Sequence, residues 1–183
     1  YQTTLFPDLE YTFTHALTHE VTYGMILGAQ RRALNLRLMQ TIEAHAAGRL
    51  DEYVDRLAHY ALRAERWDKA VEFHRRAGLR AVSRSANRDA LSHFQTALTC
   101  LARLPDTTER ATLAFDLHLD VHSAAIPLLD FEMAAEHRHK AEVLAGSLGD
   151  PRRTGRVAAS RAVASWLTGD QLMRWPLLRR PFA

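Results

Sequence analysis

Two pairs of histidines stand four residues apart, a spacing that places both side chains on one face of a helix. The first pair is His15 and His19, and the second is His118 and His122. Two imidazoles at this spacing form half of a zinc site. Neither pair follows the His-Glu-x-x-His order of metalloproteases, and no third ligand is evident. We therefore favour surface or helix-capping roles for these histidines and predict no metal site.

Two other kinds of active chemistry are absent from the sequence. The eight glycines contain no Gly-x4-Gly-Lys-Ser/Thr loop, so we do not expect this chain alone to bind ATP tightly. The single cysteine, Cys100, lies in an apolar helical stripe, which disfavours a reactive thiolate and predicts a small buried hydrophobe. No Ser-His-Asp or Cys-His arrangement can be argued. We therefore predict that the chain is not an enzyme, with no catalytic residues and no cofactor of its own.

The charge pattern indicates a soluble protein with solvated helices. Lys69 and Lys140 are the only lysines, so arginine supplies almost all of the positive charge behind the net charge of +3. These arginines alternate with acidic residues along the chain, which favours i,i+4 ion pairs on helix faces over a nucleic-acid groove. No apolar run approaches the ~18 residues that span a bilayer. A cytoplasmic location is the default expectation, with no membrane partner.

Apolar periodicity predicts helices from about residue 50 to residue 168. The stripes cover residues 50–62, 67–82, 90–101, 113–124, 131–148 and 157–167. Short breaks separate them, among them residues 105–108, where Thr and Asp can cap the next helix, Pro127, and residues 149–151. Connections this short make neighbouring helices antiparallel.

An alanine pattern repeats within this helical region. Ala70 and Ala77 flank His74, Ala90 and Ala97 flank Phe94, and a weaker copy spans residues 134–141. Small residues one turn from a large one allow two helices to pack closely, which is the logic of a tetratricopeptide helix pair. The residues at 129–131 are also echoed at 168–171, and this spacing of about 40 residues exceeds the ~34 of that repeat. We predict an all-α antiparallel helical-hairpin array of tetratricopeptide type over residues 50–170, with a plain helical bundle as the alternative. Trp67 and Phe94 are predicted to be core side chains.

The first residues predict a different kind of structure. A β-type segment at residues 11–13 leads directly into a helical pattern with apolar residues at Leu17, Val21 and Met25. We expect a chain that opens in the middle of a strand to be a piece of a longer protein. Two prolines, Pro176 and Pro181, predict an irregular tail over residues 171–183.

Several blocks together resemble one protein family. They are Leu5-Phe6-Pro7-Asp8-Leu9-Glu10-Tyr11-Thr12-Phe13-Thr14-His15-Ala16-Leu17, Glu20-Val21-x-Tyr23, Arg31-Arg32-x-Leu34, Leu57-Ala58-His59-Tyr60-Ala61, Trp67-Asp68-Lys69-Ala70, Ser85-Ala86-Asn87-Arg88-Asp89-Ala90 and Gly149-Asp150-Pro151-Arg152-Arg153. Over roughly residues 1–170 the chain resembles the bacterial signal-transduction ATPases of the STAND/AAA type that carry tetratricopeptide repeats. These ATPases are often fused to a class III adenylate or guanylate cyclase domain.

The resemblance implies a division of labour within a longer protein. Residues 1–45 would be the C-terminal part of a winged-helix domain, and residues 50–170 would be the first repeats. His15 would align with a winged-helix histidine near the phosphates of bound ADP. The family usually has His after Arg-Arg-x-Leu, where this chain has Asn35.

The function implied is a non-catalytic regulatory and protein-interaction segment. It would couple a protein partner or inducer on the array to the ATP/ADP-binding module of the parent. Two alternatives remain open from the residues: a metal-dependent hydrolase built on the histidine-rich helices, and a nucleic-acid-binding module. The second ranks last because the recognition helix of a winged helix would precede this chain.

Overall fold

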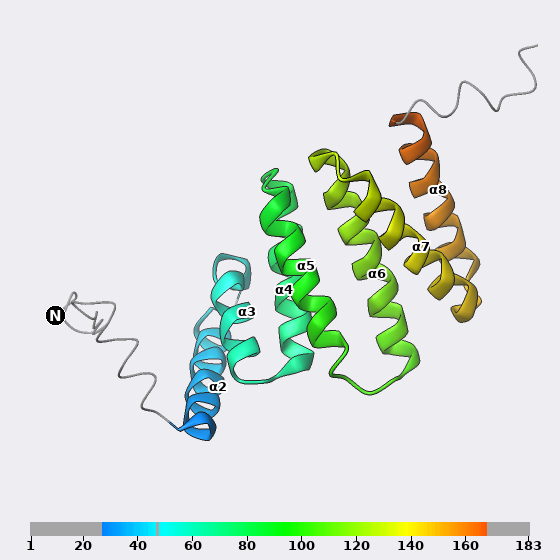
Figure 1. The fold of residues 1–183 in the computed structure, drawn as a ribbon. Helices are drawn as coiled ribbons and strands as arrows, with labels where there is room; N and C mark the ends of the chain where they lie inside the picture. The colour runs from blue at the N-terminus through cyan, green and yellow to red at the C-terminus, as the bar shows by residue number, and fades with distance from the viewer. Residues whose placement is uncertain (1–26, 47, 168–183) are drawn as a thin grey trace, which may run out of the picture.

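The computed structural model describes residues 27–46 and 48–167, with side chains described as far as residue 162 (Figure 1). The predicted strand-to-helix junction with His15 and His19, and the predicted irregular tail, lie outside the described residues. Within the described part of the chain, all regular structure is helical. The elements are α2 (Gly28–His45), η1 (Leu50–Glu52), α3 (Val54–Arg63), α4 (Trp67–Ser83), α5 (Asn87–Leu101), α6 (Thr108–Ala125), η2 (Ile126–Leu128), α7 (Phe131–Leu148) and α8 (Pro151–Leu167).

The helices from α3 to α8 follow the apolar stripes of the sequence. The predicted cap is confirmed at Thr107, whose hydroxyl accepts a hydrogen bond from the backbone N–H of Arg110 at 3.1 Å. Pro127 lies in the 3₁₀ turn after α6, and Gly149 separates α7 from α8. Helix α2 has no one-sided stripe, because polar Asn35 is buried while Leu34 is exposed. Periodicity alone therefore did not mark α2 as a separate helix.

Three of the interhelical turns share one backbone geometry. Glu65, Ser85 and Leu129 adopt left-handed φ values of 56°, 59° and 61°. In each turn the next residue's N–H donates to a carbonyl five residues back, as from Ala86 to Ala81 at 2.9 Å. This is the bond that closes a Schellman cap and satisfies a helix-end carbonyl. Glu65 and Ser85 stand 20 positions apart (65 to 85), and Ser85 and Leu129 stand 44 positions apart (85 to 129).

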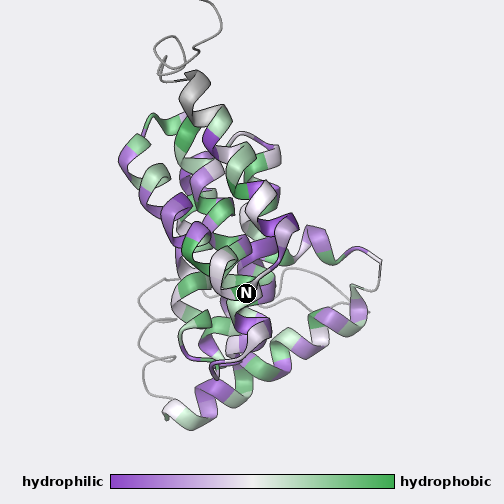
Figure 2. Cartoon of the chain, turned by 90° about the vertical axis from the view of Figure 1, so that its right-hand side faces the viewer, coloured by the Kyte–Doolittle hydropathy of each residue, from purple (hydrophilic) through white to green (hydrophobic). Residues whose placement is uncertain are grey.

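The helices stand in a row, and successive helices reverse direction (Figure 1). Each packs mainly on its neighbours in the chain, most extensively α4 on α5 and α6 on α7. Hydrophobic and hydrophilic residues are mixed along each helix (Figure 2), as expected when one side of a helix is buried and the other meets water. One apolar core runs from α2 to α7, and a smaller second cluster joins α6, α7 and α8.

The repeated alanines lie where the helices approach most closely. Ala70, Ala77, Ala90 and Ala97 have no solvent exposure, and neither has Phe94. The ring of Phe94 packs on Gly78 of α4, where even one added carbon would overlap it. The prediction that Phe94 is a knob between small residues is therefore confirmed. Among the residues that the structure describes, no helix is long and apolar enough to cross a membrane.

Candidate functional site

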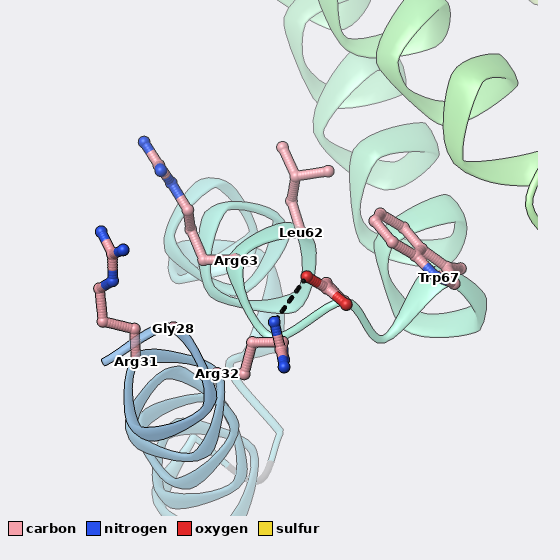
Figure 3. A pocket seen from close by; sticks show the side chains of 7 residues that line it. Gly28, Arg31, Arg32, Leu62, Arg63 and Trp67 are labelled. Carbon is pink, nitrogen blue, oxygen red and sulfur yellow. Dashed lines mark hydrogen bonds and ion pairs between the residues drawn. The ribbon is translucent and has the colours of Figure 1, made fainter. Parts of the chain in front are cut away.

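A cationic pocket of about 320 Å³ opens where α2, α3 and the start of α4 meet (Figure 3). Its lining includes Arg31 and Arg32 of α2, Arg63 at the end of α3, and Glu65 in the turn that follows. Arg32 forms an ion pair with Glu65 at 3.2 Å. Three guanidinium groups thus share the pocket with one carboxylate. Such a surplus of arginine is suited to a carboxylate or phosphate group on a partner.

The walls of this pocket depend on the α3–α4 turn. Figure 3 shows Arg31 and Arg63 extending beside each other from neighbouring helices, while Arg32 reaches towards the turn. The left-handed Glu65 ends α3 and places Trp67 at the start of α4, on the far wall. Trp67 is half-buried and packs on the main core, with the Arg103 guanidinium 5.9 Å from its ring centre. Trp67 is thus both a core side chain, as predicted, and part of the pocket.

Two histidine–histidine contacts form the second notable feature. His74 of α4 faces His93 of α5, with 3.1 Å between the two Nδ1 atoms. His118 of α6 faces His137 of α7, again with 3.1 Å between the Nδ1 atoms. The partners are 19 residues apart in both pairs. The second pair follows the first by 44 positions (74 to 118), the interval that also separates Ser85 from Leu129.

Burial lowers the pKa of one imidazole in each pair, His74 and His118. The pKa of His74 is lowered to about 4, first by burial and then by the nearby His93 and His59, while Asp55 opposes the shift. The pKa of His118 is also lowered to about 4 by burial, by His137 and by Lys140. Removing a cation from water disfavours its charged form, and a like charge nearby adds to the effect.

The predicted surface or capping role is wrong for His122, which is buried, and the i,i+4 pair of the sequence does not act as one unit. His118 turns to His137, whereas the Nδ1–H of the buried His122 donates to the backbone carbonyl of Ala134 at 2.9 Å. Among the described residues, no three His, Cys, Asp or Glu side chains are grouped to hold a metal ion. Cys100 is buried, and burial raises the pKa of its thiol. Its predicted role as a small core residue is confirmed.

Charged side chains also connect alternate helices of the row. Asp116 of α6 contacts Arg156 of α8 at 2.6 Å and Arg75 of α4 at 3.6 Å. The Arg75 Nε also donates to Asp120 at 2.7 Å. Burial raises the pKa of the Asp120 carboxyl, and the bond from Arg75 counteracts that shift. The sequence predicted i,i+4 pairs within helices, and several exist, whereas these contacts join different helices.

Asn35, the residue that departs from the family pattern, is a structural group. Its side chain is 3% exposed, and its Nδ2 donates to the backbone carbonyl of Arg31 at 2.7 Å. It lies on α2 close to the arginines of the cationic pocket. His15, the predicted ADP-phosphate contact, lies outside the described residues.

Comparisons with known proteins add no relative. No family model matches the chain, and neither a curated protein nor a solved structure matches it.

Sequence reasoning missed two parts of these features. Arg63 and His93 were not singled out, because each matters only through a residue on another helix. A signal was present for the histidines, since the interval from His74 to His93 equals that from His118 to His137. Nothing in the sequence marks Arg63, which is brought to Arg31 by the packing of α3 on α2.

Proposed function

We propose that this chain is a non-catalytic regulatory and protein-interaction segment of a signalling ATPase. The row of helices would present a surface to a protein partner or inducer. Binding there would shift the nucleotide-binding module of the parent between its ADP-bound and ATP-bound states, a population shift of the usual kind. The sequence blocks that resemble such ATPases, sometimes cyclase-linked, support this proposal.

The observation that carries the proposal is the row itself. Each helix packs mainly on its neighbours in the chain, so every helix retains a side facing solvent. Helices arranged in this way form an extended binding surface. Large apolar side chains lie on it, including Leu79, Leu129 and Val143, which are 46%, 73% and 59% exposed. Under this proposal the array is of tetratricopeptide type with an unusually long repeat.

The cationic pocket suggests where the array would act on the rest of the parent. It lies between α2, which belongs to the proposed winged-helix remnant, and α3–α4, which belong to the proposed repeats. A partner that shifted the repeats would change the distance between Arg31 and Arg63 across this junction. ADP would be held upstream, with the imidazole of His15 donating to a phosphate.

The first experiment asks whether the chain is catalytically silent. Purified chain is assayed for ATP hydrolysis and for cyclic-nucleotide formation, beside a heat-killed sample. We expect both rates to equal those of the killed sample. Turnover above that background in either assay would contradict the proposal.

The second experiment tests the junction in the longer parent protein. Arg63→Glu reverses a charge in the pocket, and Arg88→Glu reverses an exposed charge on α5 as the matched control. We expect Arg63→Glu, like His15→Ala, to speed ADP release, because both would weaken the closed resting state. ADP release that is unchanged in both variants, or changed equally in the Arg88 control, would refute the coupling.

A further inference from the structure

The two histidine pairs occupy equivalent places in two successive helix pairs. His74–His93 joins α4 to α5, and His118–His137 joins α6 to α7, with the same 3.1 Å between Nδ1 atoms. These are also the two most extensively packed helix pairs of the row. An identical contact at the same interval of 44 positions means that both helix pairs respond to the same chemical change.

Hydrogen-bond chemistry limits what each pair can hold. A neutral imidazole has one N–H donor and one bare nitrogen acceptor, and a protonated imidazole has only donors. Two Nδ1 atoms at 3.1 Å therefore require one N–H and one bare nitrogen. When both rings are protonated, two N–H groups and two positive charges face each other, and the bond is lost.

The surroundings of His74 favour the neutral bond. Its Nε2 is buried without a partner among the described residues. A proton there would place a donor where nothing accepts it, which is costly. His93, in contrast, has a carboxylate near its Nε2, which lies 3.7 Å from Asp55 of α3. Asp55 is shared with Arg80 of α4, and His59 of α3 adds a further positive group on acidification.

The second pair has its own set of neighbours. Lys140 and Glu136 form an ion pair on α7, and both face His118. Lys140 lowers the pKa of His118, and Glu136 raises it. His118 also lines a groove of about 300 Å³ between α5, α6 and α7, whose charged residues are Asp106 and Arg110. Helix α5 contributes apolar Leu98 and Leu101 to that groove, so no carboxylate from α5 stabilises a charged His118.

We propose that the two histidine–histidine bonds form an acid-responsive clasp, which holds both helix pairs closed when the imidazoles are neutral and loosens both together in mild acid. This inference stands apart from the proposed function, since it concerns the cohesion of the row and not its partner.

The expected pH window follows from the titrating groups. His74 and His118 have pKa values of about 4 in the folded chain, against an ordinary value of 6.5. Because the folded state disfavours their protons, their contribution to stability is complete above pH 6.5 and is lost as the pH falls towards 4. Between pH 7.5 and 5.5, each histidine should raise the unfolding equilibrium constant about tenfold, and the two together about a hundredfold.

The test compares two double variants of the whole chain. His74→Asn/His118→Asn removes one imidazole from each pair, and Asn keeps an amide near the Nδ1 position without titrating. His45→Asn/His139→Asn removes two exposed imidazoles as the control. Urea unfolding at pH 7.5 and 5.5 should show the hundredfold pH effect in the wild type and the control, and a loss of most of it in the clasp variant. An equal pH effect in both variants would overturn the proposal.

A second measurement does not depend on the variants folding. Histidine NMR titration of the wild type should show two imidazoles that stay neutral well below pH 6. The rate of backbone amide hydrogen exchange, corrected for its intrinsic pH dependence, should be raised at pH 5.5 more in α4–α5 and α6–α7 than in α2–α3. Titration of all histidines near 6.5, or a uniform rise of exchange along the chain, would refute the clasp.

Discussion

Replacing Gly78 by alanine has two opposing effects on the free energy of unfolding: overpacking lowers it, and the helix preference of alanine raises it. Gly78 lies within α4 and is buried against the Phe94 ring of α5. An added Cβ would lie 2.7 Å from Cδ1 and 2.8 Å from Cζ of that ring. Phe94 has no solvent exposure, so the ring has no free space in which to move. The substitution must therefore push α4 and α5 apart or force the ring from its preferred rotamer.

The magnitude can be worked from these two effects. Overpacking of a filled core costs roughly 1–3 kcal/mol. Alanine is favoured over glycine within a helix by roughly 0.5–1 kcal/mol. The net loss of unfolding free energy for Gly78→Ala should therefore be roughly 0–2.5 kcal/mol. Gly146→Ala in α7 is the matched control, because nothing lies within 4 Å of its added Cβ. The unfolding free energy of Gly146→Ala should therefore rise by the helix preference of alanine alone.

The assay is thermal unfolding of both variants beside the wild type. The expected difference of about 1–3 kcal/mol between the variants corresponds to a Tm gap of roughly 2–12 °C for a chain of this size. Gly78→Ala should also lower the unfolding free energy less in a Phe94→Leu background, because the smaller leucine leaves more room beside the added Cβ. If Gly78→Ala melts as high as Gly146→Ala, the close approach of α4 and α5 at Phe94 is wrong.

Three further predictions concern stability. Ala97→Leu should lower the unfolding free energy by roughly 1–3 kcal/mol, because Ala97 has no exposure and cannot accept a larger side chain; an unchanged Tm would contradict the packing. Leu129→Gly should raise the free energy of unfolding by about 0.5 kcal/mol because it relieves a left-handed φ of 61°, whereas Gly149→Ala, at φ 64°, should lower it by about 1 kcal/mol. Urea unfolding measures both changes, and a change of the same sign in the two variants would refute the argument from the left-handed turns. Arg75→Met should cost roughly 1.5–3 kcal/mol because it removes the charged donor from the half-buried Asp120 carboxylate, while Arg88→Met should stay within about 0.5 kcal/mol. Equal chemical denaturation of the two variants would show that the contact between α4 and α6 is not formed.

The helices and their order could be predicted because apolar periodicity is local information. The stripe at residues 67–82 corresponds to α4, and the stripe at 90–101 to α5, with ends set by turns and caps. The burial of Ala90, Ala97 and Phe94 was likewise predictable, since a large residue between two small ones has one obvious packing role. These features depend on residues within a few turns of one another.

The contacts between helices could not be predicted in the same way. The partner of His74 depends on the length of the α4–α5 turn and on the rotation of α5, so His93 carries no mark of its own in the sequence. Arg63 reaches the cationic pocket through the packing of α3 on α2, and Trp67 follows a turn in which Glu65 adopts a left-handed φ that a glutamate seldom has. Helix α2 was not predicted from apolar periodicity because the polar Asn35 occupies one of its buried positions.

The second core cluster sets how firmly the end of the row is held. Phe115, Leu119, Ala141 and Ala145 come from α6 and α7, and Val157 is the member supplied by residues 151–162 of α8. In a row where helices contact mainly their neighbours, each helix is retained by the interface at its side. Helix α8 can therefore detach while the core from α2 to α7 stays intact. Its backbone amides should be the least protected of the C-terminal half, so that cooperative unfolding of the chain proceeds inward from α8.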